Sequence, residues 1–161
     1  MVVQERELGQ SILIESISFM VEDYYSSWKD SVSIYMALTE LDELTDTFES
    51  NYTMGTRQLV LEADTLYYGT VPEEWFTIEL QIPFWYPGES NLLLELVSPG
   101  TDGGYTDIYN WNSNSSRALV SYDCSQSTGS LDSWVPYMIL SGSLSLDQRT
   151  FASIKVIAGS H

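Results

Sequence analysis

The stretch Trp75–Val97, WFTIELQIPFWYPGESNLLLELV, decides the fold, because two strand patterns flank a turn within it. Every second residue from Phe76 to Ile82 is apolar and alternates with mostly polar residues, as in a strand with one face in a core. Pro83 cannot donate to a ladder, so residues 83–86 are expected to be a frayed or edge end. The turn formers in residues 87–91 and the apolar run in residues 92–97 then predict a β-hairpin.

Further strand patterns surround this stretch. They are rich in β-branched and aromatic residues and cover residues 12–22, 32–38, 58–68 (one or two strands), 105–111, 117–122, 135–140 and 151–157. Residues 23–31, 98–104 and 123–133 carry Ser, Gly and Asp and predict loops, and residues 41–49 predict a loop with at most one or two helical turns. The whole pattern predicts one all-β domain over residues 1–161, an antiparallel, jelly-roll-like β-sandwich of about nine short strands.

Composition excludes several classes of partner. The chain has 161 residues, of which 23 are acidic and 6 are basic, giving a net charge of −17. Such a surface lacks the basic patch that nucleic acids or anionic membranes require. No apolar run approaches the roughly 20 residues that span a bilayer. Cys124 is the only cysteine, so no internal disulfide can form, and it is read as a small core or surface thiol.

Catalytic residues are sparse in the sequence. The one histidine, His161, is the last residue, which argues against Ser-His-Asp or Cys-His chemistry and against histidine metal sites. Carboxylates in or near the central strands, Glu62, Asp64, Glu73, Glu74, Glu79 and Glu95, could pair across a cleft, but solvated charges on strand faces are far commoner. The chain is therefore predicted not to be an enzyme.

Aromatic residues are the more suggestive feature, with 5 Trp, 11 Tyr and 5 Phe. On one strand over residues 105–111, the side chains of Tyr105, Asp107, Tyr109 and Trp111 would share a face. Flat rings at this spacing can stack on successive sugars while a carboxylate bonds hydroxyls, although a neighbouring strand could equally bury them. Three further tryptophans in or beside predicted loops are reserve ligand-binding candidates: Trp28, Trp85 and Trp134.

Calcium is the metal that best fits the acidic loops. Asp102, with two glycines beside it, and Asp107 could supply the carboxylate oxygens that calcium prefers, while ordinary turn aspartates are the alternative. Two three-residue patterns, at Asn51 and Asn114, match the glycosylation sequon, which arises often by chance.

Several of these motifs together resemble a β-sandwich module of bacterial secreted multidomain proteins. The matches are an Ile-Tyr-Met strand at residues 34–36, the Trp75 to Leu92 hairpin with Pro83, Phe84 and Tyr86, Ser116-Arg117, and Pro136. The resemblance covers about residues 10 to 142. It implies a non-catalytic accessory role outside the cell, beside peptidase, adhesin or polysaccharide-degrading domains.

The sequence thus predicts a secreted, non-catalytic module that binds polysaccharide through the aromatic platform, with calcium as a candidate cofactor. The first ten residues, MVVQERELGQ, lack the order of a secretion signal, and the chain is expected to be an excised piece of a longer secreted protein. The alternative is a structural or adhesive unit that contacts other proteins, neighbouring domains or copies of itself.

Overall fold

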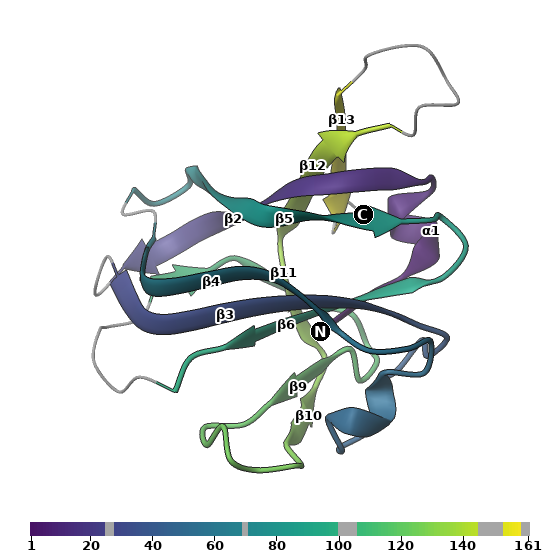
Figure 1. The fold of residues 1–161 in the computed structure, drawn as a ribbon. Helices are drawn as coiled ribbons and strands as arrows, with labels where there is room; N and C mark the ends of the chain where they lie inside the picture. Colours follow the sequence, from purple (N-terminus) through teal and green to yellow (C-terminus); the bar gives the residue numbers. More distant parts are fainter. Residues whose placement is uncertain (25–27, 69–70, 100–105, 145–152, 159–161) are drawn as a thin grey trace.

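The structure is a computed structural model that describes residues 1–24, 28–68, 71–99, 106–144 and 153–158. Two antiparallel sheets face each other in it, which confirms the predicted all-β sandwich (Figure 1). The strand order of the first sheet is β1 (Val2–Val3), β6 (Asn91–Val97), β3 (Trp28–Thr39) and β4 (Gln58–Tyr67). The order of the second is β13 (Ser153–Ala158), β12 (Met138–Ser143), β2 (Ile12–Tyr24) and β5 (Trp75–Tyr86), and β7 (Thr106–Ile108) pairs with the end of β2.

Two small ribbons and two helical turns complete the described part of the chain. β8 (Asn110–Asn112) pairs with β11 (Trp134–Pro136), and β9 (Ala118–Val120) pairs with β10 (Ser130–Asp132). The helical turns are α1 (Glu5–Leu8) and the 3-10 helix η1 (Glu49–Asn51), which begins at the last residue of the predicted loop over residues 41–49. The jelly-roll topology stays a prediction.

The main core lies between the two sheets. Buried side chains of β2, β5 and β12 pack with buried side chains of β3, β4 and β6 in one cluster, and the largest fully buried side chains include Tyr86, Ile14, Ile34 and Met36. The period-two alternation of the sequence therefore produces a closed apolar layer. At Gly142 the ladder shifts register, and a Cβ there would lie 1.8 Å from the carbonyl oxygen of Leu13, so β12 requires glycine at this position.

The predicted hairpin over residues 75–97 is wrong in its pairing. β5 pairs with β2 in one sheet and β6 pairs with β1 and β3 in the other, so the connection between them crosses the sandwich. One hydrogen bond and one backbone angle shape this crossing. The Tyr86 hydroxyl donates to the Ser90 carbonyl oxygen at 2.6 Å, and Gly88 adopts φ 88°, a conformation that glycine allows. Because Phe84 and Tyr86 are buried and paired with β2, the end of β5 is not frayed, and the edge alternative of the prediction is the correct one.

β5 lies at an edge of its sheet, as Pro83 indicates, and leaves the β2 ladder locally between Glu79 and Phe84. There the Gln81 side chain reaches the edge strand of the opposite sheet, where its Oε1 accepts from Glu62 N at 3.0 Å and its Nε2 donates to Glu62 O at 2.7 Å. The Gln81 amide thereby satisfies the backbone N–H and C=O of Glu62, which β4 presents at the edge of its sheet, and it links the edge strands β5 and β4.

A second, smaller apolar cluster lies on the outer face of the four-stranded sheet. Ala37 of β3 and Leu93 of β6 point away from the main core and pack with Val2 and Leu44, while Leu119 of β9 lies against them. Residues 41–57 and the β9–β10 ribbon therefore cover part of this face, as Figure 1 shows.

Three other predicted boundaries change. The loop expected over residues 23–31 contains the end of β2 and the start of β3, and residues 25–27 lie outside the described ranges. The single strand expected over residues 105–111 is divided into β7 and β8, and residues 134–143 form β11 and β12. Pairing with different strands explains both divisions, since local propensity does not specify a partner.

Candidate functional site

The β8–β11 ribbon places two tryptophans on opposite faces. Trp111 is the Cα partner of Val135, and Trp134 is the Cα partner of Asn112. Directly opposed residues of an antiparallel pair point to the same side, so Trp111 shares a face with the buried Val135. Trp134 shares the other face with the exposed Asn112, and 53% of Trp134 is accessible to solvent.

Trp111 is held by a buried arginine. The Arg117 guanidinium carbon lies 5.4 Å from the centre of the Trp111 ring, in cation–π geometry, and Arg117 itself is 3% exposed. Arg117 donates to the Val2 carbonyl oxygen at 3.0 and 3.2 Å and forms an ion pair with Glu7. The Trp111 Nε1 atom is buried without a hydrogen-bond partner among the described residues. These contacts give Trp111 a packing role.

The expected aromatic platform does not lie on one strand. Asp107 is exposed on β7, opposite Asp23 of β2, whereas Trp111 is on β8. Tyr109 lies between them, half-buried, where its backbone N donates to Met20 O at 3.0 Å and its carbonyl accepts from Tyr137 N at 2.8 Å. Tyr105 lies outside the described residues.

A polar hollow of about 440 Å³ lies beside Trp134. Its lining residues are amides, hydroxyls and one carboxylate: Glu43, Asn112, Asn114, Ser115, Ser116 and Ser133. Ser133 precedes Trp134 in the chain, and Asn112 lies directly opposite the tryptophan in the ribbon. An accessible indole ring is thus placed next to several groups that can bond hydroxyls.

Hydrogen bonds fix the segments that line the hollow. Asn112 Oδ1 accepts from Asn114 N at 2.8 Å, so the Asn112 amide nitrogen is the group left to donate outward. Asn114 adopts φ 59°, a left-handed conformation that asparagine tolerates. The Leu44 backbone N donates to Ser116 O at 2.7 Å, which fixes the segment carrying Glu43 against the hollow.

The other candidate aromatics lie elsewhere. Trp85 is 45% exposed on the outer side of β5, between the inward-facing Phe84 and Tyr86. Trp28 is half-buried at the start of β3, opposite Tyr67 of β4. The structure therefore brings neither of these tryptophans into the polar hollow.

The calcium prediction falls partly outside the described residues. Asp102 is not among them, and Asp107 is exposed on β7. Within the described ranges, no group of three or more His, Cys, Asp or Glu side chains could hold a metal ion. The sequon at Asn51 is also unsuitable for a glycan, because Asn51 is 4% exposed and its side chain bonds Thr45 and Thr47.

Sequence reasoning identified Trp134 beside the hollow but missed the residues that line it. The lining residues come from three segments far apart in the chain: Glu43 after β3, the run from Asn112 to Ser116 at the end of β8, and Ser133 before β11. No local pattern joins them. The sequon at Asn114 was the one signal in this region. Cys124 is exposed, in the polar loop before β10.

Comparison with protein-family models, with curated proteins and with solved structures gave no match to this chain. The resemblance to secreted β-sandwich modules therefore stays a prediction. No helix among the described residues is long and apolar enough to cross a bilayer.

Proposed function

We propose that this chain is a secreted, non-catalytic β-sandwich that binds polysaccharide, with Trp134 at the centre of its binding site. The observation that carries the proposal is the exposed Trp134 ring, 53% accessible, beside a hollow of amides and hydroxyls. An indole ring can stack on the apolar face of a sugar while Asn112 and Ser133 bond its hydroxyls. The strong negative charge of the chain favours neutral polysaccharides over anionic ones.

Trp134 replaces Trp111 as the leading ring in this proposal. Arg117 lies over the Trp111 ring, whereas the Trp134 ring makes no aromatic or cation–π contact within the described residues. Tyr109 and Asp107 remain outside the proposed contact area because they belong to the β7 end of the β2 sheet.

A polysaccharide screen by affinity electrophoresis tests the proposal, with neutral plant, algal and bacterial polymers in the gels. The Trp134→Ala variant should lose the retardation, with a fall in affinity of at least about tenfold, equivalent to about 1.4 kcal/mol. Trp85→Ala is the matched control, since Trp85 is 45% exposed on a different strand, and it should bind like the unchanged protein.

No retardation with any polymer, or equal retardation of Trp134→Ala, would overturn the proposal. If only Trp85→Ala lost the retardation, the binding site would instead lie on the outer face of β5. Repeating a positive gel with calcium and then with chelator tests the predicted calcium site at Asp102 and Asp107, because loss in chelator would bring these carboxylates into binding.

The second candidate function is an adhesive unit, favoured by apolar residues on the β9–β10 ribbon. Leu131 is 43% exposed on the face that it shares with Leu119, Val120 is 41% exposed on the opposite face, and Tyr122 follows β9 fully exposed. A partner protein, a neighbouring domain or a second copy could cover these side chains. Sedimentation analysis of the protein and of Leu131→Thr tests the adhesive role by measuring self-association. Self-association that the substitution abolishes would support this role.

A further inference from the structure

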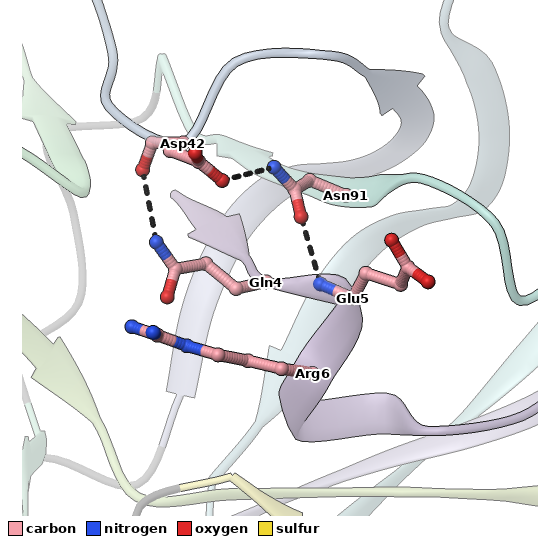
Figure 2. Close-up of a pocket in the computed structure, with 5 residues that line it drawn as sticks. All are labelled: Gln4, Glu5, Arg6, Asp42 and Asn91. Carbon is pink, nitrogen blue, oxygen red and sulfur yellow. Dashed lines mark hydrogen bonds between the residues drawn. The ribbon is translucent and has the colours of Figure 1, made fainter.

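A second pocket lies at the start of α1, away from Trp134. It has a volume of about 290 Å³ and is lined by Gln4, Glu5, Arg6, Asp42 and Asn91 (Figure 2). Three separate segments meet here: the N-terminal segment, the loop after β3, and the first residue of β6. Sequence patterns gave no sign of this meeting.

One wall of the pocket is fixed by a buried amide. Asn91 is 7% exposed, its Oδ1 accepts from Glu5 N at 2.7 Å, and its Nδ2 donates to Leu41 O at 2.9 Å. The same Nδ2 donates to Asp42 Oδ1 at 3.0 Å, which leaves the second Asp42 oxygen available. The Asp42 carboxylate is thus positioned before any ligand arrives.

A buried acceptor in the pocket has no partner. Gln4 is 8% exposed, and its Nε2 donates to the Asp42 carbonyl oxygen at 3.4 Å. This bond turns Oε1 to the opposite side of the amide, where Figure 2 shows it facing Arg6. Oε1 is directed at the Glu7 backbone N in the capping box of α1 but makes no hydrogen bond of ordinary geometry within the described residues. A buried acceptor without such a bond costs about 1–3 kcal/mol. The atom therefore favours a ligand that donates.

The pocket also holds a cation without an ion pair. Arg57 pairs with Glu95, and Arg117 pairs with Glu7, whereas Arg6, the remaining arginine of the described residues, is exposed and pairs with no carboxylate there. This is unexpected in a chain with 23 acidic residues. A guanidinium binds a carboxylate through two parallel hydrogen bonds, so Arg6 favours a ligand with that group.

We propose that this pocket binds a small zwitterion of the α-amino acid class. The ligand carboxylate bonds the Arg6 guanidinium, and the ligand ammonium donates to Gln4 Oε1. The carboxylates of Glu5 and Asp42 supply the negative potential that an ammonium group prefers. The proposal is independent of polysaccharide binding, because none of these residues lines the hollow beside Trp134.

Three matched probes test whether the pocket binds both charged groups of the ligand. They are L-alanine, N-acetyl-L-alanine, which lacks the ammonium, and L-alaninamide, which lacks the carboxylate. In ¹H–¹⁵N spectra, alanine should shift the Glu5 and Arg6 amide signals and the Asn91 side-chain signals saturably. Each blocked probe should bind at least about tenfold more weakly, because it loses charge-assisted bonds of about 1.5–3 kcal/mol.

Arg6→Gln should weaken alanine binding by about tenfold or more for the same reason, with little effect on stability because Arg6 is exposed. Arg57→Gln, which removes a cation from another face, and Trp134→Ala should leave alanine binding unchanged. No saturable shift with alanine, equal binding of N-acetylalanine, or unchanged binding by Arg6→Gln would overturn the proposal. Retained polysaccharide binding in Arg6→Gln would show that the two sites are separate.

Discussion

Trp111 and Trp134 lie on one two-stranded ribbon, yet their surroundings are opposite. Trp111 faces inward beside Val135 and contacts the buried Arg117, while Trp134 faces outward beside Asn112 and a polar hollow. Strand alternation alone puts the two rings on different sides, because each is opposite a neighbour of the other. The comparison teaches that aromatic content does not locate a ligand surface until the strand partners are known.

The largest expected effect comes from removing the charge that holds Trp111. Arg117→Met should lower the free energy of unfolding by about 3–5 kcal/mol, because it leaves Glu7 and the Val2 carbonyl without their donor. Urea denaturation followed by tryptophan fluorescence measures the change. Arg57→Met, at a more exposed ion pair, is the control and should cost about 1 kcal/mol or less. Equal costs for the two variants would remove the distinction between the buried and exposed pairs.

Trp111→Ala should be nearly as damaging to stability. We expect a loss of about 3 kcal/mol, since the substitution empties the space between β8 and Arg117. The folded fraction should still bind polysaccharide as tightly as the unchanged protein. A stable Trp111→Ala protein that has lost binding would instead restore the platform of Trp111 and its neighbours as the site.

Asn112→Ala tests the outward face with a smaller effect. It removes the acceptor for Asn114 N and the outward amide, so we expect about 1 kcal/mol of lost stability and about fivefold weaker polysaccharide binding. Both are measured on one preparation by denaturation and affinity electrophoresis. Ser121→Ala, which removes a similar local bond to Asp123 in the next loop, should leave binding unchanged.

The smallest expected effect is a difference in oxidation rate between the two tryptophans of the unchanged protein. Limited oxidation with N-bromosuccinimide, read by peptide mass spectrometry, should modify Trp134 before Trp111, because Trp134 is 53% exposed and Trp111 is half-buried. Bound polysaccharide should then protect Trp134 but leave oxidation of Trp85 unchanged. Equal rates at Trp111 and Trp134 would contradict the difference between the two faces.

The sequence predicted strands better than strand partners. The alternation from Phe76 to Ile82 correctly located β5, and the apolar run after Asn91 correctly located β6. Both features are local, because side chains in a strand alternate between two faces. The hairpin was wrong because a five-residue connection is compatible either with a return along one sheet or with a crossing to the other. Burial of Tyr86 and its bond to Ser90 accompany the crossing.

The candidate site also has one part that the sequence predicted and another that only the tertiary structure revealed. The sequence by itself determined an acidic all-β chain, and it included Trp134 among the aromatic candidates. Only the tertiary structure decided that Trp134 faces outward beside Asn112, and that Gln4, Arg6 and Asn91 line one pocket. The physical reason is that composition and periodicity are local properties, whereas a binding site depends on contacts between residues far apart in the chain.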